Sequence, residues 1–229
     1  IFFVNNKVIK YFIDEKIIDN RITKSKIKQK YFPKTKKISK NFYSYPFWEG
    51  DTFYSCGNFQ LFKNLLSWLK ENLWEKKNIE EKIMIELCKK FYYEKTLKRI
   101  EFFQSLNPDY NYPIKINETD VIPLPEIIKK IPWDLLSKGI PTFIHGDLQF
   151  DNIIYNKKSN RFLLIDWRQD FAGKIEFGDL YYDIAKVYGG ILLNYDLIKK
   201  GLFKFSQSGK KVIFDFAIRD STLRYKEIL

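Results

Sequence analysis

The spacing of hydrophobic residues along the chain changes character near Gly50. Before it, short runs of β-branched and aromatic residues predict strands: two within residues 1–12, around an Asn-Asn turn, and a third in residues 41–48. Residues 13–31 between them carry a sparse helical pattern, which Pro33 ends. These runs predict a small β-rich region with one helix.

Beyond Gly50 the apolar residues recur at helical spacing. Residues 59–74 and 79–103 each place them every three or four positions, as in helices that bury one face. The stripes consist of Phe62, Leu65, Leu66, Leu69 and Leu73, then of Ile83, Leu87, Phe91 and Ile100. An irregular proline-rich link, Pro108 to Pro125, and at most a short helix at 132–136 follow. We expect an α+β fold with a boundary near Gly50, dividing residues 1–50 from residues 51–229.

A β-hairpin is predicted in residues 152–165, where two apolar runs flank a turn-rich segment. A three-residue loop between Lys157 and Arg161 would place Asn152 directly opposite Asp166, on the same face and about 5 Å away. A four-residue loop would shift the register by one residue and separate the two faces. We expect the three-residue loop.

Composition excludes several classes of protein. With 229 residues, 45% of them hydrophobic and 18% aromatic, the chain has too much apolar surface to stay disordered. Its two cysteines, Cys56 and Cys88, exclude a disulfide scaffold and favour a reducing cytoplasm. No apolar run reaches the roughly 18 to 20 residues of a membrane span, so we expect a cytoplasmic protein without a membrane partner.

The net charge of +12 raises the question of nucleic-acid binding. Only six of the 40 basic residues are arginine, the residue that most often recognises phosphates and guanines in a forked geometry. The densest block, Lys24 to Lys40, carries eight lysines and no acid; a solvated helix and loop and an anion-attracting patch are both open, and the first is favoured. We therefore rank a basic nucleic-acid-binding module last.

The predicted hairpin gathers oxygen-bearing side chains at one end. Asp147 precedes Asn152 by five residues, in a loop that Gly146 frees to turn tightly, and Asp166 follows the second strand. Two carboxylates and an amide oxygen are hard ligands that suit Mg²⁺, which fills its other positions with water and substrate phosphates.

The pattern His145-Gly146-Asp147, Asn152 and Ile165-Asp166-Trp167 resembles the signature of the aminoglycoside phosphotransferase and choline kinase superfamily, relatives of the protein kinases. The resemblance implies a kinase-like bilobal fold: a truncated β-rich N-lobe and a larger, mainly helical C-lobe that contains the catalytic hairpin. It further implies that Asp147 is the catalytic base and that Asn152 and Asp166 are metal ligands. His145, the only histidine, becomes a structural residue of the loop.

The segment from Phe177 to Lys186 is similar to the part of the family that follows the metal-binding aspartate. Asp179 is placed to cap a helix in which apolar residues recur at helical spacing. The resemblance gives Asp179 and Asp183 supporting roles behind the catalytic loop. Arg168 and Gln169, directly after the Asp166-Trp167 pair, are expected on the acceptor side.

The N-terminal part resembles the family less. Lys10 lies in a run similar to the strand whose lysine contacts the α- and β-phosphates of ATP. Residues 45–50, which include Phe47 and Trp48, look like the hinge that holds the adenine. A glycine-rich phosphate loop is not seen, and the element that would carry it is expected before Ile1. The partner glutamate of the lysine is also not seen on the following helix.

The favoured hypothesis is an ATP- and Mg²⁺-dependent phosphotransferase that acts on a hydroxyl of a small molecule, of aminoglycoside, choline or ethanolamine, or sugar type. The alternative is a kinase-like nucleotide-binding or regulatory protein without catalysis. Aromatic residues such as Trp48, Trp167, Tyr181 and Tyr182 either form a cage for a cationic acceptor or belong to the core, and the core is the commoner outcome.

Overall fold

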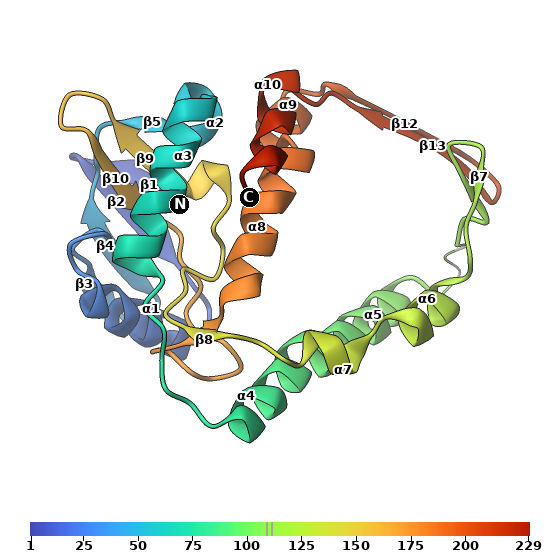
Figure 1. Cartoon of the computed structure of the whole chain (residues 1–229), viewed down its shortest axis with the longest axis horizontal. Helices are drawn as coiled ribbons and strands as arrows, with labels where there is room; N and C mark the ends of the chain where they lie inside the picture. Colours follow the sequence, from blue (N-terminus) through green and yellow to red (C-terminus); the bar gives the residue numbers. More distant parts are fainter. Residues whose placement is uncertain (109, 111) are drawn as a thin grey trace. The chain divides into compact units, whose positions relative to one another are not determined.

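The computed structural model describes residues 1–108, 110 and 112–229 and has a mixed α+β architecture, as the sequence predicts (Figure 1). Two residues of the expected proline-rich link, 109 and 111, lie outside the described residues. The chain forms two compact units. The first comprises Ile1–Ile79, Gly139–Leu193 and Asp220–Leu229, and the second comprises Glu80–Lys138 and Asn194–Arg219. Gly50 lies inside the first unit, and the expected boundary between residues 1–50 and 51–229 stays a prediction.

The first unit begins with an antiparallel sheet in the order β1-β2-β4-β3. Asn5 and Asn6 form the turn between the first two strands in left-handed conformations, which asparagine tolerates well. The strands are β1 (Phe2–Val4), β2 (Lys7–Tyr11), β3 (Lys36–Ser39) and β4 (Phe42–Pro46). The expected strands at 1–12 and 41–48 are thus confirmed, whereas β3 replaces part of the solvated helix and loop expected in the Lys24 to Lys40 block.

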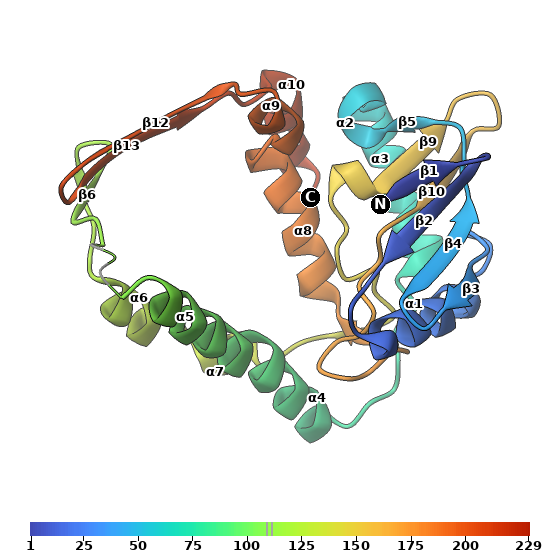
Figure 2. The same ribbon diagram turned by 180° about the vertical axis from the view of Figure 1, so that it is seen from behind.

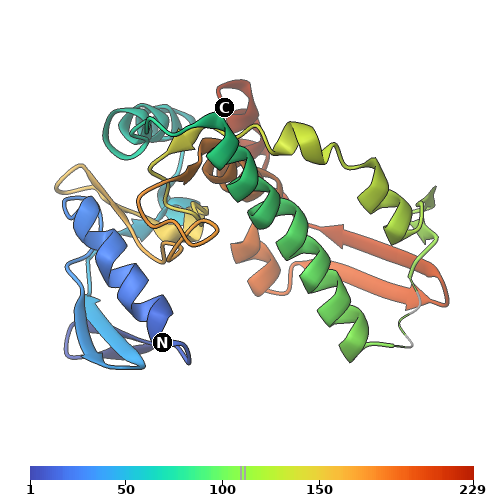
Figure 3. The ribbon, with the colours of Figure 1, turned by 90° about the horizontal axis from the view of Figure 1, so that it is seen from below.

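Helix α1 (Glu15–Ile27) follows β2 and lies across this sheet (Figure 3). It begins where the Asp14 side chain accepts a hydrogen bond from the Lys16 amide, a typical N-cap. Its buried Ile18 packs with Val8, Tyr43 and Tyr45 of the strands, which explains how a helix of low hydrophobicity stays attached.

A second sheet, in the order β10-β9-β5, carries the predicted hairpin. Its strands are β5 (Asp51–Thr52), β9 (Ile153–Asn156) and β10 (Arg161–Leu164). Arg161 pairs with Asn156, so the loop has four residues and the three-residue register expected from the sequence is wrong by one. Asn156 accepts a hydrogen bond from the Ser159 amide, and Asn160 adopts a left-handed conformation; together they shape the longer turn. Asn152 therefore lies beside Ile165, whose amide donates to its carbonyl.

The helices of the first unit bury one face each, as the spacing predicts. Phe62, Leu65, Leu69 and Leu73 are fully buried. Phe53, Phe150 and Tyr225 pack their rings around Phe62. The elements are α2 (Phe53–Cys56), α3 (Phe59–Trp68) continuing as η1 (Leu69–Leu73), η3 (Phe150–Asn152), α8 (Leu180–Leu192), α10 (Asp220–Leu223) and η4 (Arg224–Glu227), with β8 (Pro141–Thr142) paired to β11 (Gly178–Asp179).

The second unit contains the long helix predicted at 79–103 and a small sheet in the order β12-β13-β6-β7 (Figure 2). The expected buried stripe is confirmed at Phe91 but not at Ile83, which is 40% exposed; Met84 and Cys88 are buried instead. The elements are α4 (Glu81–Cys88), η2 (Lys89–Glu94), α5 (Lys95–Leu106), α6 (Leu124–Lys130), α7 (Trp133–Leu136), α9 (Tyr195–Lys199), β6 (Lys115–Ile116), β7 (Thr119–Asp120), β12 (Phe203–Ser208) and β13 (Lys211–Phe216). None of the helices in the described part of the chain combines the length and apolar character needed to cross a bilayer.

Candidate functional site

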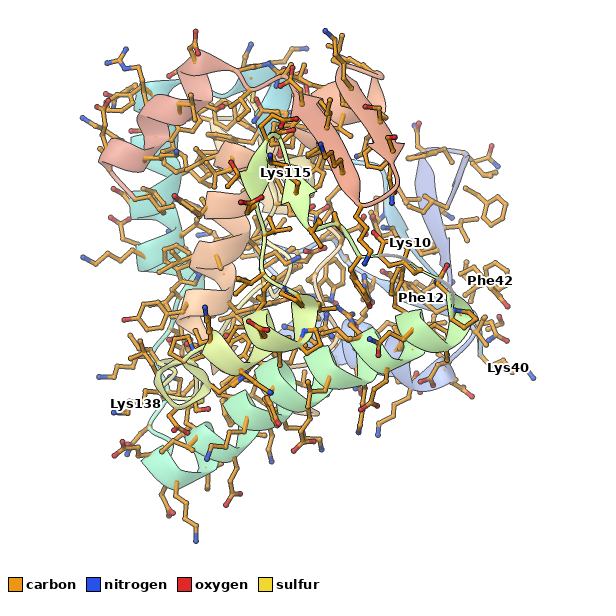
Figure 4. The ribbon with its side chains drawn as sticks, turned by 90° about the vertical axis from the view of Figure 1, so that its right-hand side faces the viewer. Lys10, Phe12, Lys40, Phe42, Lys115 and Lys138 are labelled. Carbon is orange, nitrogen blue, oxygen red and sulfur yellow. The ribbon has the colours of Figure 1, made fainter. Side chains whose placement is uncertain are left out.

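Lys10 of β2, labelled in Figure 4, points to the buried side of the sheet. It forms an ion pair with Asp166. Only 5% of the lysine is exposed, and its pKa is lowered to about 8, by burial first and by the nearby Arg21 charge second. The carboxylate that pairs with Lys10 is thus Asp166 and not an acid of α1. The two acids of α1 itself, Glu15 and Asp19, both contact Lys37 of β3 instead.

Asp166 reaches Lys10 because the chain turns sharply after β10. Its φ of 58° is left-handed, a conformation that aspartate adopts more readily than most residues. The turn resets the direction of the side chain, so the strand register no longer decides which way the carboxylate faces. The corrected register therefore removes the argument that Asn152 and Asp166 share one face, but it does not separate Asp166 from the site.

Asp147 and Asn152, the second pair of candidate site residues, contact each other directly. The Asn152 amide nitrogen donates to the Asp147 backbone carbonyl at 2.8 Å and lies 3.4 Å from the Asp147 carboxylate. Because the nitrogen is used in this way, the amide oxygen is the atom that can face a cation. The second Asp147 oxygen lies 3.0 Å from the Lys186 ammonium of α8, and 37% of the Asp147 side chain is exposed. A small molecule can therefore reach this carboxylate.

The His145 ring connects the segment that carries Asp147 with the segment that carries Asp166. Its Nε2 lies 2.9 Å from the Ile165 carbonyl, and its Nδ1 accepts the Asp147 amide hydrogen at 3.1 Å. A carbonyl only accepts, so Nε2 carries the proton and the ring is neutral. Burial, with a smaller contribution from the Lys24 charge, lowers the pKa of His145 to about 3. This is the geometry of a structural residue that holds Asp147 at a fixed distance from the residue before Asp166.

Asp183 of α8 holds the loop that contains His145 and Gly146. Its carboxylate accepts the backbone amides of His145 and Gly146 at 2.8 and 2.7 Å, and the Trp74 indole at 3.1 Å. Burial raises the pKa of Asp183 to about 6, against the opposing effect of these hydrogen bonds. Asp179 caps α8 by accepting from the Tyr181 amide and also accepts the Ile140 amide. Both aspartates are buried, and both accept backbone amides of the segments that lead to or form the loop.

Gly146 permits the close approach of the loop to the turn that follows Asp166. Its φ is 85°, and a Cβ at this position would lie 2.6 Å from the Arg168 Cβ. Arg168 donates from Nε to the Asp170 carbonyl, and both Arg168 and Gln169 are half-buried. The acceptor-side role expected of Arg168 and Gln169 stays a prediction.

A cavity of about 280 Å³ opens beside the Lys10–Asp166 ion pair. Phe47 and Trp48 of the expected hinge line it, together with apolar residues of both sheets. The full lining is Ile1, Phe3, Val8, Lys10, Tyr45, Phe47, Trp48, Gly50, Thr52, Ile154, Leu163, Ile165 and Asp166. The volume is close to the lower end for small-ligand sites, and the wall is mostly apolar, with Lys10 and Asp166 as charged residues in it.

The residues that could hold a metal ion are Asp147, Asn152 and Asp166. Within the described parts of the chain, no three His, Cys, Asp or Glu side chains form a cluster, so any cation would depend on the Asn152 oxygen as well as on carboxylates. This donor set fits Mg²⁺, which takes few protein ligands. In this structure the Lys10 ammonium contacts the Asp166 carboxylate, which is one of the groups that would bind such an ion.

Two lysines of the site were not singled out from the sequence. Lys24 was part of the block interpreted as solvated, yet it is 1% exposed, while Lys28 and Lys37 of the same block pair with acids. Lys186 contacts Asp147 from α8. Lys186 lies three residues after Asp183, so both are on one helix face, and this spacing could have indicated that Lys186 lies near the site. The weak helical pattern around Lys24 did not show which of its residues are buried.

The aromatic residues divide between core and surface. Trp167 is fully buried among Phe32, Tyr43 and Tyr45, and its indole donates to the Arg21 carbonyl. Tyr181, by contrast, is 56% exposed. Trp167 therefore belongs to the core and not to a cage for a cation.

No protein-family model, no curated protein and no solved structure matches this chain.

Proposed function

We propose that this chain is an ATP- and Mg²⁺-dependent phosphotransferase that transfers the γ-phosphoryl group to a hydroxyl of a small molecule, with the kinase-like bilobal fold of the aminoglycoside phosphotransferase and choline kinase superfamily. One observation carries the proposal. The Asp147–Asn152 pair and the Lys10–Asp166 pair are linked through the His145 ring, and the second pair lines an apolar cavity.

In this proposal Asp147 is the base. The acceptor hydroxyl attacks the γ-phosphorus, its proton passes to the Asp147 carboxylate, and the bond to the bridging oxygen breaks, releasing ADP. The exposure of Asp147 supports this role, since the carboxylate is reachable. A bound Mg²⁺ would neutralise charge on the phosphates, and Asn152 and Asp166 are the residues that would hold it.

Lys10 and the cavity form the nucleotide side. The base of the nucleotide would lie against Phe47 and Trp48, and its phosphates would extend towards Lys10. Binding then exchanges partners: Lys10 leaves Asp166 for the phosphates, and Asp166 becomes free to ligate the metal ion. Because the ion pair is partly buried, each charged group needs its new partner to offset the loss of the old one.

A panel of acceptors tests the proposal. Purified protein is incubated with ATP, Mg²⁺ and aminoglycosides, choline, ethanolamine or sugars, and ADP release is measured. We expect release that depends on one acceptor class, stops when EDTA removes the metal, and is lost in Asp166→Asn. Acceptor-independent release at the same rate in wild type and in Asp147→Asn would contradict it.

The second candidate is a kinase-like protein that binds nucleotide without catalysis. The direct Lys10–Asp166 contact favours it, because that contact occupies the carboxylate required for the metal ion. Thermal unfolding with and without Mg-ATP separates the two candidates: stabilisation by the nucleotide without ADP release from any acceptor would favour the second.

A further inference from the structure

Lys24 is a buried cation that extends from α1 to the two segments of the candidate site. Its ammonium donates to the Arg168 carbonyl at 2.9 Å and lies 3.4 Å from the His145 carbonyl. Only 1% of the residue is exposed. Burying an ammonium costs free energy unless its hydrogens find partners, so the hydrogen bonds to the two carbonyls must offset the loss of water.

The charges around Lys24 do not form a simple ion pair. Burial lowers the pKa of Lys24 to about 8; the Asp183 and Asp170 charges raise this pKa, and the Arg168 and Arg21 charges lower it. The hydrogen bonds of the ammonium go to backbone carbonyls. The ammonium therefore binds the main chain of the site and not one carboxylate. This is how a side chain fixes the position of a loop.

The two carbonyls belong to segments that already touch each other. The Arg168 amide donates to the His145 carbonyl at 3.0 Å, so this carbonyl faces both Lys24 and Arg168. His145 precedes Asp147 by two residues, and Arg168 follows Asp166 by two residues. A shift of either carbonyl is therefore passed on to the proposed base or to the proposed metal ligand.

We propose that Lys24 is a positioning residue, which clamps the His145 loop to the turn after Asp166 and so sets the distance between Asp147 and Asp166. The proposal rests on the proposed phosphotransferase function for its effect on turnover. Its structural part, the clamp between the two segments, can be measured without any activity.

The experiment replaces Lys24 by methionine, which has a similar length and no donor. Lys26→Met is the matched control, because Lys26 lies on the same helix and is exposed. Amide hydrogen exchange is followed by mass spectrometry in peptides covering 143–150 and 164–171. In Lys24→Met we expect exchange in both segments to be at least about tenfold faster, whereas Lys26→Met matches wild type.

Steady-state kinetics with Mg-ATP and the acceptor from the panel give the second measurement. We expect kcat to fall at least about tenfold in Lys24→Met while KM for the nucleotide changes less than about threefold, because β2 and the cavity are not altered. A protein that merely loses folded fraction would show neither this division nor exchange confined to the two segments. Where Lys24→Met does not fold, Lys24→Gln, which keeps a donor without the charge, takes its place.

Three results would overturn an assignment. Unchanged exchange in both segments removes the clamp, whatever the activity. Faster exchange with an unchanged kcat removes the positioning role in catalysis. Faster exchange in a protein whose wild type transfers no phosphoryl group to any acceptor retains the clamp and refutes the proposed function instead.

Discussion

Replacing His145 by glutamine removes the only histidine of the chain and changes how stability depends on pH. In the folded protein burial lowers the pKa of His145 to about 3, from 6.5 for an accessible histidine. The unfolded chain therefore binds a proton near pH 6.5 that the folded protein refuses until about pH 3. The stability contributed by the neutral ring is complete above pH 6.5 and is lost progressively as the pH falls towards 3.

The magnitude follows from these two pKa values. Between pH 7.5 and pH 5.0 the wild-type protein should lose about 2 kcal/mol of unfolding free energy relative to His145→Gln, which has no group titrating at this position. Asp183 acts in the opposite sense below pH 6, because its raised pKa makes the folded state take up a proton there. Both proteins contain Asp183, so its contribution cancels in the difference.

Urea unfolding of both proteins at pH 7.5, 6.5, 5.5 and 5.0, followed by tryptophan fluorescence, measures the difference. At pH 7.5 the variant should be less stable by about 1–3 kcal/mol, since the Asp147 amide and the Ile165 carbonyl lose their partner. That deficit should shrink steadily towards pH 5.0. A deficit that stays constant within about 0.5 kcal/mol would show that His145 titrates normally, and the buried neutral ring would then be refuted.

The remaining predictions concern the loop and the core. Asp147→Asn should lower turnover by roughly 10²- to 10⁴-fold with nearly unchanged nucleotide affinity, and a fully active variant, measured by ADP release, would remove the base assignment. Gly146→Ala should destabilise the protein by more than the roughly 1–2 kcal/mol of a left-handed alanine, because its Cβ would lie 2.6 Å from the Arg168 Cβ. Gly173→Ala is the control, since its φ of 90° is similar but no atom lies within 4 Å; equal losses in thermal unfolding would rule out the steric argument. Trp167→Phe should cost about 1–3 kcal/mol, because the part-buried Arg21 carbonyl loses its indole donor, and an unchanged urea midpoint would contradict this.

Hydrophobic spacing was enough to predict most of the helices and strands of the first unit. The Asn5-Asn6 turn, the strand at 42–46 and the stripe from Phe62 to Leu73 depend on local sequence, and the structure confirms them. The hairpin register was not predictable in this way. It depends on whether the loop has three or four residues, and the pairing of Arg161 with Asn156 shows four.

The candidate site shows a similar limit. The sequence brings Asp147, Asn152 and Asp166 to one hairpin, because residues near a hairpin are neighbours in space. Lys24 was not predictable, since its two carbonyl partners lie 144 and 121 residues away in the chain. The partner of Lys10 was missed for the same reason: a direct contact with Asp166 is a tertiary feature that strand patterns do not encode.

The central claim is that Lys10 and Asp166 form a metal-dependent nucleotide site, and calorimetric titration with ATP tests it most directly. Wild-type protein and Asp166→Asn are each titrated with ATP in Mg²⁺ and again in EDTA, with thermal unfolding to establish that both are folded. The account predicts binding by the wild type that requires Mg²⁺ and loss of that requirement, or of binding itself, in Asp166→Asn. No binding of ATP by the folded wild-type protein in Mg²⁺, or equal Mg²⁺-dependent binding by both proteins, would contradict it.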